Sequence, residues 1–328
     1  GNATLQTYAV NSLKNSLSPW FKGENADALV YDASWGGLVS TLGLEDAMAD
    51  FGNGWYNDHH FHYGYLLYAS AVLAKHDAEF FKPGTARAAG LEALLRDVAN
   101  PGTAGFGGTG PPKNIGAKAG RRRLRSKEEE AGFGASKLDG SPLEKLFPLA
   151  RHKDWYDGHS WASGLFPMAN GKSQESVSEA VNCYYAVHLV GKATGDEALS
   201  RYGRPLLATE LRAAKWYWQS GTGWAVYPAA FAQSKMAGVV GASDTKVWTW
   251  FGPNLEYVHG INMMPFTPAT EALLSPGFIA QEYPVVEPLL EDQGNGGGLP
   301  DQWRGILELA HAVIRPEAAW RAVTPLAS

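Results

Sequence analysis

Apolar residues recur at helical spacing along most of the chain. This period of about 3.6 residues predicts helices at 4–16, 59–76, 85–98, 174–194, 196–218 and 303–314, with weaker ones near 44–50, 159–166 and 265–274. Strand-like runs are few and short, such as Leu29–Tyr31 and Trp224–Tyr227. Helices and strands do not alternate, so a parallel sheet is not expected and the pattern predicts a mainly α fold.

Two of the predicted helices carry a polar stripe opposite an ordinary apolar face. When residues are drawn about 100° apart, the stripe of the later helix contains Glu175, Glu179, Asn182 and Ala186. The stripe of the earlier helix contains Asp58, His62, Tyr65 and Ala69. Neither stripe contains lysine, and tyrosine and histidine suit a wet cleft better than an open surface. The alternative is that both stripes face solvent or cap their helices.

Three carboxylates would meet if the two stripes face each other: Asp58, Glu175 and Glu179. Hydrolysis of a glycosidic bond needs one carboxylic acid that protonates the leaving oxygen and one ionised carboxylate. Neighbouring negative charges and apolar surroundings raise the pKa of a carboxyl group, which helps one member of such a set to keep its proton. The stripes therefore indicate a site for proton transfer.

Histidines near Asp58 raise the alternative of a metal site. They are His59, His60 and His62, with His159 further along the chain. However, the H-E-x-x-H pattern is absent, and the single cysteine, Cys183, excludes a multi-cysteine zinc site. We therefore expect no metal and no other cofactor, and expect the histidines to bind sugar hydroxyls or to orient Asp58. Patterns for a serine nucleophile elbow or a phosphate-binding loop are also absent.

Composition narrows the class of partner. The 328 residues have a formal net charge of -5, which is too mild to indicate a nucleic acid or a charged membrane surface. No apolar run approaches the ~20 residues of a membrane span. The 12 Trp, 14 Tyr and 13 Phe often stand beside Gly, Asn, Asp or His, a setting that suits stacking on sugar rings as well as core packing.

Domain organisation follows from a change in composition along the chain. Residues 103–146 are rich in Gly, Pro and charge, and we expect them to be a flexible insertion in a single domain spanning 1–328. The first residues lack the pattern of a secretory signal peptide, and the chain starts at Gly1. We expect it to be part of a longer protein and to be monomeric.

Four sequence blocks are distinctive in content and order. They are DFGNGWYNDHHFHYGY at 50–65, RHKDWYDGHSWASG at 151–164, QESVSEAVNCYY at 174–185 and WFGPNLEYVHGINMMPFTP at 250–268. Together they resemble glycoside hydrolase family 81, a family of endo-β-1,3-glucanases. The resemblance implies an (α/α)6 toroid, an inverting reaction without a metal, and β-1,3-glucan as the partner. A polymer substrate in turn suggests an extracellular or cell-wall location.

The resemblance also implies roles for the carboxylates. Asp58 would be the general acid, Glu179 the general base, and Glu175 a helper that positions water or substrate. A helix N-terminus favours an ionised Asp58, so neighbouring charges and burial would have to keep its proton in place. An inverting site needs roughly 6.5–9.5 Å between acid and base. Glu175 and Glu179, about 6 Å apart on one predicted helix, fit base and helper better than acid and base.

Further residues of the four blocks are expected to bind substrate. They are His62, Tyr65, His159, Trp161, Gln174, Asn182, Trp250, Glu256 and His259. For each, the alternative is a structural role, such as a buried tryptophan or a histidine that bonds a helix end.

Two other functions remain open at this point. One is a β-glucan-binding receptor that does not cleave its ligand, and the presence of all three carboxylates favours the enzyme over it. The other is a polysaccharide lyase on a similar toroid. A lyase acts on uronic acids and usually uses cationic groups to neutralise the sugar carboxylate, but no arginine-rich cluster accompanies the candidate residues.

Overall fold

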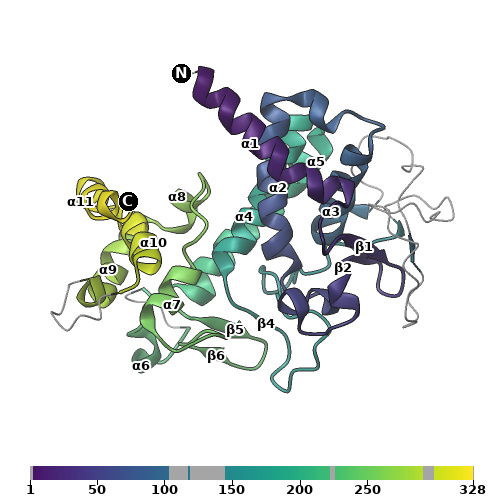
Figure 1. Cartoon of the computed structure of the whole chain (residues 1–328). Coiled ribbons are helices and arrows are strands. Elements are labelled where there is room, and N and C mark those ends of the chain that lie inside the picture. The colour runs from purple at the N-terminus through teal and green to yellow at the C-terminus, as the bar shows by residue number, and fades with distance from the viewer. Residues whose placement is uncertain (1–2, 103–116, 119–144, 222–225, 291–298, 328) are drawn as a thin grey trace. The chain divides into compact units, whose positions relative to one another are not determined.

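The computed structural model describes residues 3–102, 117–118, 145–221, 226–290 and 299–327 (Figure 1). Most of them are helical, which confirms the prediction of a mainly α fold. The expected insertion at 103–146 lies almost entirely outside the described residues, as does the first half of the expected strand at Trp224–Tyr227.

The chain divides into two compact units. Unit 1 comprises Gly1–Lys153, Ser163–Phe166 and Cys183–Leu206, and unit 2 comprises Asp154–Ala162, Pro167–Asn182 and Leu207–Ser328. No helix among the described residues is both long enough and apolar enough to span a membrane.

Unit 1 is built on three helices that pack against one another, with short strands beside them (Figure 1). The helices are α1 (Ala3–Lys22), α2 (His59–His76) and α3 (Ala86–Ala99), and the short 3-10 turns are η1 (Leu42–Leu44), η2 (Ala49–Trp55) and η3 (Ala78–Phe81). Strand β1 (Leu29–Asp32) pairs antiparallel with β2 (Gly37–Ser40) and parallel with β3 (Ala117–Lys118). The three helices shield a leucine-rich core that includes Leu38, Leu67, Leu73 and Leu94.

Two further helices contribute to unit 1: the later part of α4 (Val177–Thr194) and the first part of α5 (Glu197–Ala213). Helix α4 approaches α2 closely at Gly64, where an added Cβ would lie 3.0 Å from the Cβ of Cys183. A larger residue at this crossing would therefore have to push the two helices apart.

Unit 2 combines a small antiparallel sheet with a group of helices. The sheet has the order β4 (Ser173–Gln174), β5 (Val239–Gly241) and β6 (Thr245–Lys246), with Gln174 opposite Val240. The helices are α6 (Ala229–Ala232), α7 (Leu255–Ile261), α8 (Thr270–Leu273), α9 (Pro276–Leu290), α10 (Asp301–His311) and α11 (Pro316–Val323). A π-helical turn at Ala214–Trp218 follows α5, and the 3-10 turn η7 (Thr324–Ala327) ends the described chain.

A buried carboxylate links three helices of unit 2. Glu282 on α9 accepts hydrogen bonds from His259 Nδ1 of α7 at 2.6 Å and from His311 Nε2 of α10 at 3.3 Å. Burial raises the pKa of Glu282, but the two histidines more than offset it and the pKa is lowered overall. The ionised carboxylate thus ties α7, and the sequence block that contains it, to the helices behind it.

Several predicted elements correspond closely to the structure, and others do not. The helix at 59–76 is confirmed in full, and those at 85–98, 196–218 and 303–314 are confirmed within a few residues. The weak helix predicted at 159–166 is wrong, because this segment is irregular. The one near 44–50 is replaced by two 3-10 turns, and that near 265–274 shrinks to α8.

Candidate active site

Asp58 stands directly before α2, at its N-cap position. Its backbone is left-handed, with φ 58°, and its side chain is half-buried. The carbonyl oxygen accepts the N–H groups of Phe61 at 2.9 Å and His62 at 3.0 Å, whereas the carboxylate makes no capping bond to the helix. The backbone carbonyl of Asp58 therefore starts the hydrogen bonding of α2.

The loop that leads to Asp58 has an unusual backbone. Positive φ angles occur at the non-glycine residues Asp50, Phe51, Tyr56 and Asp58. Side chains rarely adopt this conformation, which costs on the order of 1 kcal/mol for each residue. Such strain persists only where surrounding contacts impose it, and it is concentrated at functional sites in many proteins. The backbone therefore supports the prediction that Asp58 is functional.

His62 lies one turn after Asp58 on α2 and pairs with the strained loop. Its Nδ1 is 3.8 Å from Asp50 Oδ1, and its ring packs edge-on against Phe51. Burial lowers the pKa of His62, with the charge of Asp50 opposing this. Burial likewise raises the pKa of Asp50. The lowered pKa favours a neutral His62, which would not oppose protonation of Asp58. Tyr65, one turn further along α2, is exposed.

Glu175 and Glu179 do not lie on one helix, contrary to the prediction. Strand β4 ends at Gln174 and α4 begins at Val177, so Glu175 stands in the connection and Glu179 in the first helical turn. The backbone of α7 explains the later start, because the hydroxyls of Ser176 and Ser178 both donate to the carbonyl oxygen of Ile261. The separation expected for Glu175 and Glu179 on one helix therefore does not apply.

The remaining stripe of α4 is also more buried than predicted. Ala186 is fully buried, and Asn182 is 1% exposed. Neither amide atom of the Asn182 side chain has a hydrogen-bond partner among the described residues. Because a buried amide without a partner costs free energy, a water molecule or a ligand group is expected to satisfy it. Glu179 stays half-buried, and the partial positive charge at the start of α4 favours its ionised form.

Glu175 has an environment suited to holding a proton. The pKa of Glu175 is raised to about 7 overall. Burial is the largest cause and raises it, the backbone hydrogen bond from Trp250 lowers it, and the neighbouring Glu179 charge raises it. The donor is Trp250 N, 2.7 Å from Glu175 Oε1. At mildly acidic pH, Glu175 therefore retains its proton. A protonated Glu175 is compatible with its predicted role as a helper that positions water or substrate.

We expect the stability of the wild-type chain to fall, relative to a Glu175→Gln variant, as pH rises. The folded pKa of about 7 exceeds the ordinary value of 4.5, so the advantage of the protonated group is complete below pH 4.5 and is lost as pH rises through 7. The change should be on the order of 2–3 kcal/mol. Glutamine stays neutral and can still accept from Trp250. Urea denaturation of both proteins at several pH values measures the difference, and parallel stability curves would contradict the assignment.

An aromatic surface adjoins Glu175. The Trp250 ring is 50% exposed and packs edge-on against Trp248, with ring centroids 6.2 Å apart. Lys246 Nζ lies over both rings, at 4.9 Å from Trp248 and 5.1 Å from Trp250. An exposed indole beside a carboxylate can stack on the apolar face of a sugar ring. The geometry therefore agrees with the predicted substrate-binding role of Trp250.

Two other predicted substrate-binding residues are engaged inside unit 2. Gln174 is fully buried and donates from Nε2 to Glu210 Oε1 at 3.0 Å. The same oxygen accepts Ser160 N at 3.2 Å, so the buried Glu210 joins two of the distinctive sequence blocks. His159 is also buried, and its Nδ1 donates to the carbonyl oxygen of Ser160 at 2.8 Å. Direct sugar contact by Gln174 or His159 would require these side chains to become uncovered.

The remaining candidates are partly accessible or linked to neighbours. Trp161 is half-buried, and its Nε1 donates to Asp154 Oδ2 at 3.1 Å. Glu256, in the first turn of α7, is nearly buried and accepts from Asn254 Nδ2 at 2.8 Å. His259 is fully buried, and its Nδ1 lies 2.6 Å from Glu282 Oε1. Substrate contact by Trp161 and Glu256 stays a prediction.

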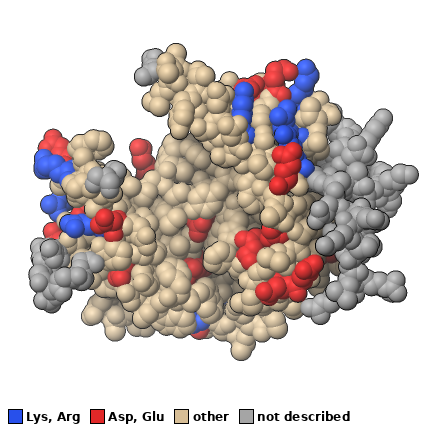
Figure 2. Space-filling model, viewed as in Figure 1, with Lys and Arg blue, Asp and Glu red and all other residues tan. Residues whose placement is uncertain are grey.

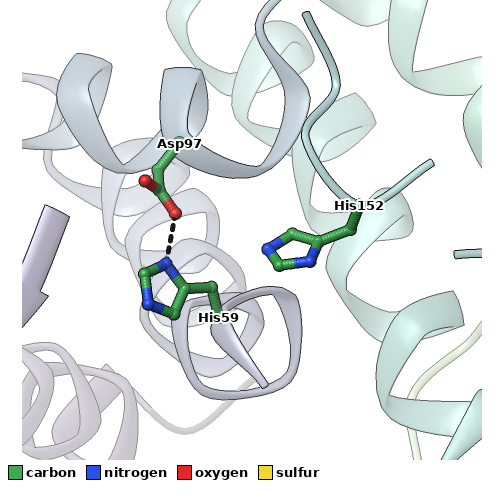
Figure 3. A group of neighbouring side chains, drawn as sticks. All are labelled: His59, Asp97 and His152. Carbon is green, nitrogen blue, oxygen red and sulfur yellow. Dashed lines mark hydrogen bonds and ion pairs between the residues drawn. The ribbon is translucent and has the colours of Figure 1, made fainter. Parts of the chain in front are cut away.

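One buried group has the composition of a metal site. His59, Asp97 and His152 offer ligand atoms within 4.8 Å of one another (Figure 3). However, both nitrogens of His59 face acceptors: Nδ1 is 2.7 Å from Asp97 Oδ2, and Nε2 is 2.8 Å from the carbonyl oxygen of Asn53. A nitrogen that donates a hydrogen bond has no lone pair for a metal. This arrangement is therefore a buried histidine–aspartate ion pair.

Sequence patterns did not single out three of the buried carboxylates: Asp97, Glu210 and Glu282. Asp97 and Glu210 lie within predicted helices whose periodicity identifies apolar positions only, and Glu282 lies in α9, which was not predicted. Each bonds a partner far along the chain. No local signal distinguishes them from surface acids. Asp50 and Asn53 do lie within the first distinctive sequence block, at 50–65. The resemblance of that block to the family was the only signal that this loop is functional.

Comparison with known proteins gives the family. The sequence profile of the glycosyl hydrolase family 81 C-terminal domain matches residues 1–106 and 138–326. The primary septum glucan endo-1,3-beta-D-glucosidase of Schizosaccharomyces pombe is 30% identical over 321 residues, which cover 98% of this chain and 27% of that protein. A glucan endo-1,3-beta-D-glucosidase of Acetivibrio thermocellus is 32% identical over 331 residues, covering 97% of this chain and 35% of that protein.

A solved structure agrees with the sequence comparisons. A glycoside hydrolase family 81 protein from Clostridium thermocellum aligns with a TM-score of 0.67 at 28% identity, covering 95% of this chain and 37% of that one. The chain thus spans about a third of the length of the curated relatives just named, 27% of one and 35% of the other. Because the family profile matches nearly all of its length, the chain belongs to glycoside hydrolase family 81, in the region of the family's C-terminal domain.

Proposed function

We propose that this chain is the catalytic domain of an endo-acting β-1,3-glucan hydrolase. The observation that carries the proposal is that three half-buried carboxylates, Asp58, Glu175 and Glu179, stand in a chain whose relatives are named glucan endo-1,3-beta-D-glucosidases. The raised pKa of Glu175 and the exposed ring of Trp250 beside it support the proposal, because they provide a proton-holding group next to a surface suited to sugar.

The proposed reaction inverts the anomeric carbon in one displacement. Asp58 donates its proton to the glycosidic oxygen as the C–O bond breaks, and Glu179 takes a proton from the water that attacks the opposite face. Glu175 helps to position this water or the substrate. An inverting mechanism requires roughly 6.5–9.5 Å between the two carboxyl groups, so that water and sugar both fit. Neither step requires a metal.

The wider organisation proposed for the chain is one (α/α)6 toroid over 1–328, interrupted by the 103–146 insertion. The family profile supports the insertion, because it matches the chain up to 106 and again from 138. The substrate-binding roles of His62, Tyr65, Trp161 and Glu256 belong to the same proposal. An extracellular or cell-wall location fits a polymer substrate, and a monomer is the expected state.

A nucleic-acid partner is disfavoured by charge. Glu45, Asp46 and Asp50 are exposed on the segment that contains η1 and η2, and Figure 2 shows acidic side chains gathered on one face of the molecule. Such a surface repels phosphate groups, whereas it does not oppose a neutral glucan. The partner proposed for this domain is therefore β-1,3-glucan alone.

The release of reducing ends from laminarin tests the proposed activity. We expect a rapid fall in polymer length together with new reducing ends, because an endo-acting enzyme cuts within the chain. Tight binding of laminarin without release of reducing ends would instead indicate a glucan receptor. A product that absorbs ultraviolet light, formed from a uronic-acid polymer, would indicate a lyase. Either result would overturn the proposed function.

A further inference from the structure

A buried ion pair lies directly behind the residue proposed as the general acid. His59 follows Asp58 in sequence, opens α2 and is fully buried. Its Nε2 lies 2.8 Å from the carbonyl oxygen of Asn53, which can only accept, so this nitrogen carries a proton. Its Nδ1 lies 2.7 Å from Asp97 Oδ2 (Figure 3).

Asp97 is ionised in this pair. Burial raises its pKa, but His59, then Arg151 and the N–H of Leu38, more than offset this, and the pKa is lowered overall. An ionised carboxylate accepts hydrogen bonds, so both ring nitrogens of His59 face acceptors at hydrogen-bond distance. His59 is therefore fixed from both sides, by α3 on one and by the loop before α2 on the other.

Asp97 also reaches the strand beside the loop. Its second carboxylate oxygen accepts Leu38 N of β2 at 2.9 Å and lies 3.8 Å from Arg151 Nη2. The Arg151 guanidinium stacks on Tyr56, 4.1 Å from the ring centroid. Tyr56 is one of the residues with positive φ, and its ring also contacts the ring of His59, with centroids 4.9 Å apart. One carboxylate thus connects α3, β2, α2 and the strained loop.

Asn53 completes the connection from the loop side. Its Oδ1 accepts Ser40 N of β2 at 2.6 Å, and its Nδ2 donates to the hydroxyl of Tyr63 at 3.1 Å. The same hydroxyl donates to the carbonyl oxygen of Leu38 at 2.9 Å. The loop before Asp58 is therefore bonded to β2 and, through the Tyr63 hydroxyl, to α2.

We propose that Asp97 is a positioning residue for the general acid, acting through His59 to hold the loop at 50–58 and to aim the Asp58 carboxyl. This inference rests on the proposed function, because it assumes that Asp58 protonates the leaving group. A displacement of about 1 Å in a reacting group can lower turnover ~100-fold. Loss of the ion pair should therefore weaken proton donation specifically, without removing any sugar contact.

The test is an Asp97→Asn variant of the full chain, assayed on two substrates. Laminarin has a sugar leaving group, which needs a proton. A dinitrophenyl β-laminarioligosaccharide has a phenolate leaving group, which departs without one. For Asp97→Asn we expect kcat on laminarin to fall roughly 10- to 100-fold with KM little changed, and kcat on the aryl substrate to fall less than about threefold. Glu92→Gln, which removes the carboxylate that pairs with Arg96 on the same helix, is the matched control and should keep the wild-type ratio of turnover on the two substrates.

Equal losses on the two substrates, or no loss on laminarin, would overturn the proposed role. Circular dichroism and thermal unfolding show whether Asp97→Asn folds. If it does not, His59→Gln takes its place, since a glutamine amide can still donate to Asn53, and the same substrate-selective loss is expected.

Asp58→Asn shows whether the positioning role or the proposed function is wrong. If wild type cleaves laminarin and Asp58→Asn shows the selective loss while the Asp97 variant does not, only the positioning role is wrong. If wild type does not cleave laminarin, the proposed function is wrong.

Discussion

Replacing Glu179 by glutamine is expected to lower the turnover of laminarin by roughly 100- to 10,000-fold, the usual cost of removing a general base. Glutamine has the same shape but cannot take a proton from water. The side chain is half-buried in the first turn of α4, so the substitution should leave the fold and glucan binding intact. Turnover by reducing-end assay and binding by calorimetry measure the two quantities separately.

Two controls make the Glu179 result specific. Azide, a small nucleophile that needs no base, should restore part of the activity of Glu179→Gln, with or without a chelator. Glu197→Gln, which removes an exposed glutamate paired with Lys192, should have wild-type turnover. Glu175→Gln should be intermediate. Near-normal turnover of Glu179→Gln would show that another group is the base.

Replacing Asp58 by asparagine is expected to have a similarly large effect, roughly 100- to 10,000-fold on laminarin, through loss of the general acid. Asparagine tolerates the left-handed backbone that Asp58 adopts, so the loop should keep its conformation. The carboxylate makes no capping bond to α2, and the helix should therefore keep its stability as well. The loss should nearly disappear on the dinitrophenyl β-laminarioligosaccharide, whose phenolate leaving group needs no proton.

A matched substitution at the other end of α2 separates catalysis from stability. Asp77 ends this helix and pairs with Lys14, so Asp77→Asn should lower the free energy of unfolding slightly and leave turnover unchanged. If Asp58→Asn lost equal activity on laminarin and on the aryl substrate, or kept wild-type turnover, Asp58 would not be the acid.

Periodicity predicted the long regular helices well, because their apolar faces record burial directly. Helix α2 was predicted residue for residue, and with it the position of Asp58 at the helix start. Helix α9 was missed because Pro284 and Pro288 interrupt the expected pattern. Helix α1 continues through Pro19 to Lys22, beyond the predicted end at residue 16, although proline normally interrupts a helix.

The site was predictable in residue type but not in local conformation. Glu175 and Glu179 fit one helical stripe in sequence, yet bonds from Ser176 and Ser178 to α7 delay the start of α4. Such bonds join segments more than 80 residues apart along the chain, as the 85 residues between Ser176 and Ile261 illustrate. Neither periodicity nor propensity contains information about partners at that separation.

Burial of the polar candidates was the least predictable feature. Gln174, His159 and His259 have residue types typical of a sugar site, and each is buried with a partner inside unit 2. The same types satisfy buried carboxylates in a helical core, and a single sequence cannot separate the two uses. The segment around Asp58 likewise has a contact that the sequence does not reveal, because the adjacent His59 bonds Asp97 on another helix.

The stereochemistry of laminarin-oligosaccharide hydrolysis tests the pairing of Asp58 with Glu179 most directly. Proton NMR recorded from the first moments of the reaction distinguishes the two anomers at the new reducing end before they equilibrate. Single displacement by water predicts that the α-anomer appears first from the β-linked substrate. Initial formation of the β-anomer would indicate a covalent intermediate and would contradict the assignment of Glu179 as a base.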